Sequence, residues 1–182
     1  MAKGAEFERS FSVNLSTWWT RNLEEPRSDV FWRSTTSGAR ATVRAKKGQS
    51  TSGQYGDITA IDPVGLPFLK AFCCELKRGY SRHSIQDMID ADKSKYGEWI
   101  GKLKKTAEAA GSLWWMLVVK RDRREPLILV PGDCWFPESP ITTIDLFDSL
   151  RLKNRIDVHT LQKLWETDPQ WILNAIEKEQ AK

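Results

Sequence analysis

Apolar residues recur at helical spacing near the start of the chain. The recurring positions, four or three residues apart, are Phe7, Phe11, Leu15 and Trp18. This spacing predicts a helix from residue 5 to about residue 23. At 100° per residue, Glu8 lies only about 50° from the centre of the apolar face, whereas Glu6 lies roughly 150° away. We therefore expect Glu8 to face the interior, where an acid needs a partner or a metal ion.

Patterns typical of strands follow this helix. The chain from Asp29 starts as a short strand, and "GDITAID" from Gly56 alternates as another. After a turn at "PVGLP", "FLKAFCCELK" (residues 68–77) is predicted to return as its antiparallel partner. The run "LWWMLVV" (residues 113–119) predicts a central strand, and "LILV" a further one.

Helical patterns account for the rest of the chain. One long helix is expected from Ser84 to about Ala110, with Gly111 as its stop. Beyond Pro131, "TIDLFDSLR" and "DVHTLQKLWETDPQWILNAIEKE" predict two more, with Thr143 and Asp157 as possible N-caps. The sequence thus predicts an α/β core at residues 1–130, ordered αβββαβ with helices flanking a mixed sheet. Residues 131–182 are expected to form a helical extension packed on that core.

Length and composition limit the possible classes of protein. The 182 residues suffice for one domain, and 40% hydrophobic with 29% charged residues is typical of a globular protein. No apolar run approaches the roughly 20 residues of a membrane helix, and the N-terminus has no secretory signal. We therefore expect a cytoplasmic protein without membrane contact. The three cysteines fit neither a disulfide framework nor a zinc site. Two histidines leave oxygen-ligated hard cations as the expected metal class.

The net charge of +4 is unevenly distributed. Residues 30–56 contain no acid, and the basic residues among them are Arg33, Arg40, Arg44, Lys46 and Lys47. Such a segment is either a solvated loop or a surface for a polyanion. Trp32, which precedes the first of these basic residues, could stack on a base, although burial in the core is the favoured expectation.

The stretch "KAFCCELKRGY" places charged residues directly after an apolar run. In a strand, Glu75 and Lys77 point to the same face, which at a surface would be an ordinary ion pair. The predicted hairpin, however, brings Asp57 close to Glu75. Two adjacent carboxylates repel each other unless a divalent cation lies between them. The Leu76 carbonyl offers a third oxygen ligand, and Lys77 could hold or deprotonate a water molecule or offset charge at phosphorus.

An acid on the first helix (Glu8), Asp57 at a strand start and the Glu75-Leu76-Lys77 element together resemble the PD-(D/E)XK nucleases, which have the restriction-endonuclease-like fold. The resemblance covers about residues 3–130. The start "KGAEFER" is also similar to the K-G-x-x-x-E-R element of archaeal Holliday-junction resolvases. The residues that carry this second likeness are Lys3, Gly4, Glu8 and Arg9, with Ser37 as a match for a serine near the first loop.

The resemblance implies a Mg²⁺-dependent endonuclease, with Mn²⁺ as a substitute, that cuts branched DNA as a homodimer. It makes Glu8, Asp57, Glu75 and Lys77 the catalytic residues and assigns the metal to Asp57, Glu75 and Leu76. Arg78 and Arg82 would extend the DNA-binding surface formed by Ser37 and the basic segment. A phage origin fits so compact a nuclease.

Three features depart from the family pattern. Gly56 stands where the family often has proline, the first loop is long, and the C-terminal part exceeds that of the small resolvases. A restriction or nicking nuclease acting on linear duplex therefore stays open. So does a non-catalytic nucleic-acid-binding module, although intact Asp57, Glu75 and Lys77 argue against it.

Overall fold

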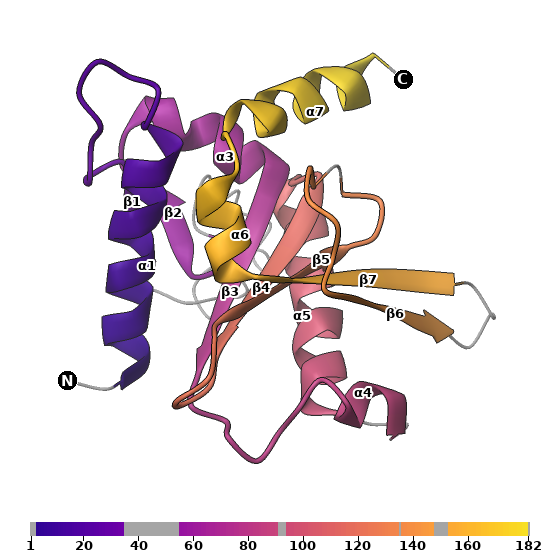
Figure 1. The fold of residues 1–182 in the computed structure, drawn as a ribbon. Helices are drawn as coiled ribbons and strands as arrows, with labels where there is room; N and C mark the ends of the chain where they lie inside the picture. The colour runs from indigo at the N-terminus through magenta and orange to yellow at the C-terminus, as the bar shows by residue number, and fades with distance from the viewer. Residues whose placement is uncertain (1–2, 35–54, 91–93, 135, 148–152, 182) are drawn as a thin grey trace, which may run out of the picture.

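The chain forms a mixed α/β fold around a five-stranded sheet, with helices on both faces (Figure 1). The structure, a computed structural model, describes residues 3–34, 55–90, 94–134, 136–147 and 153–181. The helices are α1 (Lys3–Trp19), the short 3₁₀ helix η1 (Pro63–Gly65), α3 (Leu66–Ala71), α4 (Asp87–Asp90), α5 (Lys95–Ala110), α6 (Leu161–Glu166) and α7 (Gln170–Gln180). The strands are β1 (Phe31–Arg33), β2 (Ile58–Ala60), β3 (Phe72–Arg78), β4 (Trp114–Lys120), β5 (Leu127–Pro131), β6 (Thr142–Phe147) and β7 (Lys153–Thr160).

The sheet has the strand order β3-β4-β5-β7-β6, so β3 and β6 are its edges. Strands β3 and β4 are parallel, because the connection between them contains α5 and crosses over the sheet. The remaining pairs are antiparallel. Strands β1 and β2 form a separate antiparallel ladder, in which Trp32 lies opposite Thr59.

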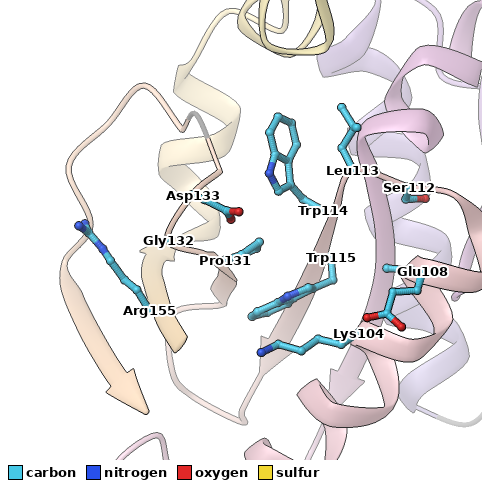
Figure 2. A pocket seen from close by; sticks show the side chains of 11 residues that line it. Lys104, Glu108, Ser112, Leu113, Trp114, Trp115, Pro131, Gly132, Asp133 and Arg155 are labelled. Carbon is cyan, nitrogen blue, oxygen red and sulfur yellow. The ribbon is translucent and has the colours of Figure 1, made fainter. Parts of the chain in front are cut away.

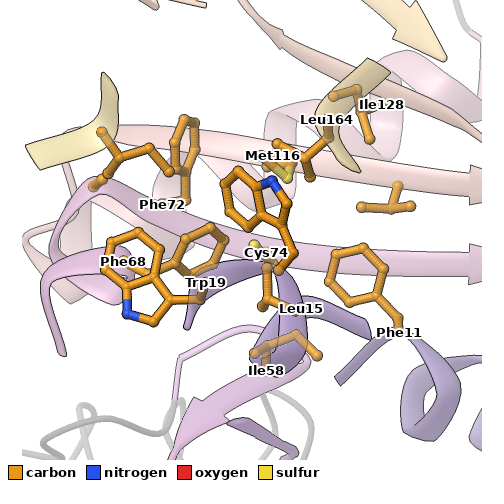
Figure 3. Packing of buried hydrophobic residues seen from close by; sticks show 14 of the residues in the cluster. Phe11, Leu15, Trp19, Ile58, Phe68, Phe72, Cys74, Met116, Ile128 and Leu164 are labelled. Carbon is orange, nitrogen blue, oxygen red and sulfur yellow. The ribbon is translucent and has the colours of Figure 1, made fainter. Parts of the chain in front are cut away.

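Two apolar clusters lie on opposite faces of the sheet. Strand β4 is buried on both sides: Met116 and Val118 belong to one cluster, and Leu117 and Val119 belong to the other. The first cluster joins α1, β2, α3 and α6 to the sheet, as the packing of Leu15 and other labelled side chains shows in Figure 3. The second lies beneath α5. A strand with both faces covered explains the uninterrupted apolar run in the sequence.

The first helix is joined to β1 by a buried serine. The Ser16 hydroxyl donates to the Ser12 carbonyl and accepts a hydrogen bond from the Phe31 amide, each at 2.8 Å. Trp19 adds a bond from its indole nitrogen to the Val64 carbonyl. These bonds fix β1, and with it Arg33, beside the inner face of α1.

Several sequence predictions are confirmed. Helix α1 and strands β4 and β5 occur where expected. Gly111 ends α5 in a left-handed conformation (φ 69°), which glycine adopts without steric cost. The single long helix expected from Ser84 to about Ala110 is correct only in its second part. Helix α4 is confined to Asp87–Asp90, and Ser94, whose backbone is extended, caps a new helix, α5. Residues 91–93 lie outside the described residues.

The expected hairpin of the second and third strands is wrong. Residues 66–71 form helix α3, and within the described sheets β2 pairs with β1 while β3 pairs with β4. Pro67 stands in the first turn of α3, where proline is tolerated, and the buried Phe68 and Ala71 lie three residues apart. A short apolar run fits a helix as well as a strand, so periodicity alone could not separate the two.

The purely helical C-terminal extension is also wrong. Residues 142–147 and 153–160 form β6 and β7, which complete the main sheet, and only α6 and α7 are helical. Thr143 and Asp157 cap no helix but face each other across the two strands, with the hydroxyl donating to the carboxylate at 2.9 Å. Thr160 caps α6 instead. The division of the chain at residue 130 stays a prediction.

Among the described helices, none combines the length and the apolar character that crossing a lipid bilayer requires.

The Ser16 bonds generate a prediction about stability. Ser16→Ala should lower the free energy of unfolding by about 1–3 kcal/mol, because the buried Phe31 amide would lose its acceptor. Thr17→Ala is the matched control, since this exposed neighbour donates only to the Val13 carbonyl. Denaturant unfolding of both variants measures the difference. Equal losses would show that the Ser16 bond does not join α1 to β1 energetically.

Candidate active site

Asp57 is held against the outer edge of β3 by two hydrogen bonds. Its backbone amide donates to the Cys74 carbonyl, and its carboxylate accepts from the Leu76 amide, both at 2.8 Å. The residue is only 6% exposed. Asp57 therefore lies beside β3 although β2 and β3 form no ladder. The sequence predicted that Asp57 lies close to Glu75, but it attributed this to a hairpin that does not form.

Gly56 makes this close approach possible. It has a φ of 74°, and a Cβ atom at this position would lie 2.4 Å from the Cys74 carbonyl oxygen. Proline, whose φ is fixed near −65°, could not adopt this conformation. The glycine that departs from the family pattern is thus required by the backbone before Asp57.

The Leu76 backbone carbonyl faces the same side as Asp57. In a strand, the N–H and C=O of one residue point to one edge, and those of its neighbours point to the other. Since the Leu76 amide donates to Asp57, its carbonyl also points away from β4 and toward Asp57. The two oxygen sources expected to share a metal ion are therefore on one edge of the sheet.

Glu75 and Lys77 project from β3 on the face covered by α5. The neighbouring residues Cys74 and Leu76 belong to the cluster on the opposite face, so the alternation predicted from the sequence holds. The Lys77 ammonium contacts and donates to the Glu75 carboxylate. Both side chains are partly buried, at 28% exposed for Glu75 and 20% for Lys77.

The site is electrostatically strained around Asp57. Burial, together with the negative charge of Glu75, raises the pKa of Asp57 to about 7, against the opposing effects of the Leu76 amide and of Lys77. Burial also acts to lower the pKa of Lys77, but the hydrogen bond to Glu75 and the nearby carboxylates outweigh it and raise that pKa. Lys77 is therefore a cation at neutral pH, while Asp57 is poised to gain or lose a proton.

The two acids of α1 point in the directions that the helix phase predicts. The Glu8 side chain is 25% exposed and lies 3.5 Å from the guanidinium of Arg33, whereas Glu6 is 67% exposed. The negative charge of Glu8 also acts to raise the pKa of Asp57, though less than burial and Glu75 do. Glu8 therefore reaches the site from the α1 side, and Arg33 is the partner that its inward position needs.

The residues predicted to bind DNA are only partly described. Arg33 lies on β1 beside Glu8. Arg78 ends β3, and one of its terminal nitrogens lies 3.9 Å from Glu6. Its Nε is buried and has no hydrogen-bond partner within the described part of the chain. Arg82 is exposed in the following turn. Outside the described residues lie Ser37, Arg40, Arg44, Lys46 and Lys47.

Two aromatic side chains near these residues are exposed. Trp32, next to Arg33, is 43% exposed, so the expectation that it is buried in the core is wrong. Tyr80 follows β3 and is 45% exposed. The sequence pattern does not single out Tyr80, because its position depends on two successive left-handed residues, Gly79 and Tyr80.

The described residues give little support to a reactive cysteine or to a metal site built from side chains alone. The three cysteines form no disulfide, and burial raises the pKa of the Cys73 thiol to about 12, so it is not a thiolate at neutral pH. No three His, Cys, Asp or Glu side chains of the described ranges form a cluster that could hold a metal ion. A cation bound here would therefore depend on two carboxylates, a carbonyl, and oxygens of water or substrate.

A cavity of about 410 Å³ lies elsewhere, between the end of α5 and the end of β5 (Figure 2). Trp114 and Trp115 line it, with the Lys104 amine 5.9 Å from the Trp115 ring centroid. Arg155 and Asp133 lie on its other side. None of the four expected catalytic residues lines this cavity, so it is not the candidate site.

The raised pKa of Asp57 predicts a pH dependence of stability. Because the folded state holds this proton up to about pH 7, and the unfolded state only to about pH 4, the stabilisation is lost as the pH rises through this interval. Asp57→Asn has no proton to lose. With EDTA present, it should therefore match the wild type near pH 4 and be more stable by up to about 4 kcal/mol at pH 8.

Denaturant unfolding across this pH range measures the difference, with Asp133→Asn, an exposed acid, as the control. A constant difference between wild type and Asp57→Asn at every pH would contradict the raised pKa.

Comparison with known proteins finds one family. The family described as "phage putative PDDEXK endonuclease" matches residues 1–174 of this chain. No curated protein and no solved structure matches it. The match covers nearly the whole chain, including α1, Asp57, all of β3 and the strands β6 and β7. The chain therefore belongs to this phage PDDEXK endonuclease family, and with it to the PD-(D/E)XK nuclease superfamily.

Proposed function

We propose that this protein is a Mg²⁺-dependent DNA endonuclease that hydrolyses phosphodiester bonds in branched DNA. The observation that carries the proposal is the position of Asp57 on the edge of β3, beside Glu75, Lys77 and the Leu76 carbonyl. Family membership supports nuclease chemistry for this arrangement. Magnesium, the branched substrate and the roles of the individual residues are parts of the proposal.

The donor set at the β3 edge fits a hard divalent cation. Asp57, Glu75 and the Leu76 carbonyl offer oxygen atoms only, which Mg²⁺ prefers. The raised pKa of Asp57 reports a buried carboxylate with too little positive charge nearby, and a cation would relieve this deficit. Two carboxylates and a carbonyl leave positions for water and for a phosphate oxygen, as is usual for Mg²⁺.

When bound, Mg²⁺ polarises a phosphoryl oxygen and lowers the pKa of a water molecule. The chain's own residues position the other participants. Lys77 is protonated at neutral pH, so it donates hydrogen bonds and can orient the attacking water or a phosphate oxygen. Glu8, held by Arg33, acts on the α1 side of the same carboxylates. In-line attack by water on phosphorus breaks the bond to the 3′ oxygen; the water loses a proton, the 3′ oxygen takes one up, and the products are a 5′-phosphate and a 3′-hydroxyl.

Two arginines beside the site are suited to contact phosphates. Arg33 and Arg78 each lie near an acid of α1, and the buried Nε of Arg78 makes no hydrogen bond within the described residues. The N-terminal likeness to junction resolvases favours a four-way junction and a homodimer, in which each subunit cuts one strand. Phosphate contacts position the DNA without reading its bases, which suits recognition by shape.

Cleavage of labelled DNA tests the proposal. The wild type should cut a four-way junction in Mg²⁺, should cut a linear duplex of the same arm sequence more slowly, and should be inactive in EDTA. Asp57→Asn, Glu75→Gln and Lys77→Ala should each lower the rate at least about a hundredfold, since each removes a group that acts on the reaction. Mg²⁺ should also raise the melting temperature of the wild type at pH 8 but not that of Asp57→Asn.

Two outcomes would contradict this proposal. Full activity of Glu75→Gln would remove Glu75 from the metal site. Equal rates on junction and linear duplex would replace junction resolution by ordinary duplex cleavage.

The two acids of α1 provide a matched pair of variants. Glu8→Gln should lower cleavage at least about tenfold, because this acid lies at the site, whereas Glu6→Gln should keep nearly all activity. Both variants lose one charge from the same helix, so a general electrostatic effect would appear in both. Single-turnover rates in Mg²⁺ measure the difference. The reverse pattern would mean that Glu8 serves only to hold Arg33.

A further inference from the structure

The exposed aromatic side chains of this protein are concentrated at the candidate site. Among the described residues, Trp32 and Tyr80 are the aromatic residues with large exposure. The chain is rich in aromatic residues, and most of the described ones are packed into the two clusters. Both exceptions lie next to residues of the site: Trp32 precedes Arg33, and Tyr80 follows Lys77 by three positions.

Tyr80 is held in place just beyond the end of β3, three residues after Lys77. Its ring packs against Trp99 of α5 in an edge arrangement, with centroids 4.7 Å apart and an angle of 71° between the planes. Since an edge contact covers at most one face of the tyrosine ring, at least one face is left uncovered by Trp99.

The backbone of Tyr80 is also unusual. Its φ of 41° lies in the left-handed region, which a bulky residue rarely adopts. Such conformations persist where the surrounding structure holds them, and they cluster at functional sites. Here the preceding Gly79 donates to the Lys120 carbonyl, and the Tyr80 carbonyl accepts from the amide of His83. The turn therefore presents the ring at the end of β3.

Trp32 lies on the other side of Asp57. It pairs with Thr59 in the β1–β2 ladder, and the ladder continues to Asp57 through a bond from the Ser34 amide to the Asp57 carbonyl at 2.8 Å. Trp32 is thus a diagonal neighbour of Asp57, at a typical backbone separation of about 7–8 Å. Phe31 points into the core, so alternation turns Trp32 away from it.

We propose that Trp32 and Tyr80 are stacking platforms for unpaired bases on either side of the cleaved bond. This inference rests on the proposed function and specifies its substrate class: a nucleic acid strand whose bases beside the scissile phosphate are not stacked in a duplex. A paired base cannot offer its face to a side chain, whereas an unpaired base of any sequence can stack on an aromatic ring. The bases of a single-stranded segment meet this requirement, as do bases beside a branch point where pairing is interrupted.

Binding measured in EDTA tests the inference without cleavage. Fluorescence anisotropy gives the Kd of the full-length protein for a labelled single strand and for a blunt duplex of the same sequence. Trp32→Leu and Tyr80→Leu should each weaken single-strand binding by about five- to hundredfold and change duplex binding less than about twofold. Trp32→Phe and Tyr80→Phe, which keep a flat ring, should stay within about threefold of the wild type.

A double-mutant cycle sharpens the test. Replacing the bases of the strand by abasic nucleotides should weaken binding to the wild type but hardly weaken it further in the Leu variants, because the same contact is already lost. Ile141→Ala, which removes exposed apolar surface before β6 at the opposite edge of the sheet, should change neither Kd. Thermal melts check that every variant is folded.

The possible results separate this inference from the proposed function. Equal weakening on strand and duplex, unchanged binding by the Leu variants, or no single-strand binding by the wild type would each overturn the stacking role, even for an active nuclease. Conversely, ring-dependent binding of the single strand by a protein that cleaves no DNA in Mg²⁺ would support the stacking role and refute the proposed function.

Discussion

The attachment of Asp57 to the free edge of β3 is the constraint on which the candidate site depends. Two short hydrogen bonds hold one residue in place, and both partners belong to the segment that supplies Glu75, Leu76 and Lys77. A shift of β3 would therefore move the whole group together. The attachment also requires Gly56, because any Cβ there would collide with the carbonyl that accepts the Asp57 amide. The left-handed conformation of Gly56 is thus what allows the neighbouring Asp57 to reach the residues of the candidate site.

Bringing these charges together has an electrostatic cost that the fold meets only in part. Lys77 and one amide stabilise the buried carboxylate of Asp57 and the partly buried carboxylate of Glu75, and the raised pKa of Asp57 reflects the remaining deficit of positive charge. Such a deficit is costly in a purely structural ion pair, which would be more stable with apolar residues. It is expected where a cation or a substrate completes the charge balance, and strongly perturbed groups cluster at functional sites for this reason.

The surroundings of the site come from distant parts of the chain. Helix α1 supplies Glu8 from one face of the sheet, while α5 supports Tyr80 through Trp99 on the other. The edge position of β3 leaves room for both approaches, since no further strand of the described sheet pairs beyond it. Strands β6 and β7 extend the opposite edge and lie far from this chemistry, so they widen the sheet without entering the site.

The sequence by itself determined the composition of the site and the local elements that carry it. Helical spacing placed Glu8 inward, and strand alternation placed Glu75 and Lys77 on one face, because both periods depend only on neighbouring residues. The sequence alone also showed that the order of these acids resembles that of the PD-(D/E)XK nucleases. Only the tertiary structure shows that Asp57 reaches β3 through hydrogen bonds to its edge, because helix α3 replaces the expected hairpin. Only the tertiary structure shows that residues 142–147 and 153–160 are strands. Short apolar runs fit a helix as well as a strand. Residues 142–147 and 153–160 are strands because β7 pairs with β5 and β6 pairs with β7. The exposure of Trp32 and Tyr80 likewise follows only from the packing of elements that are remote in sequence.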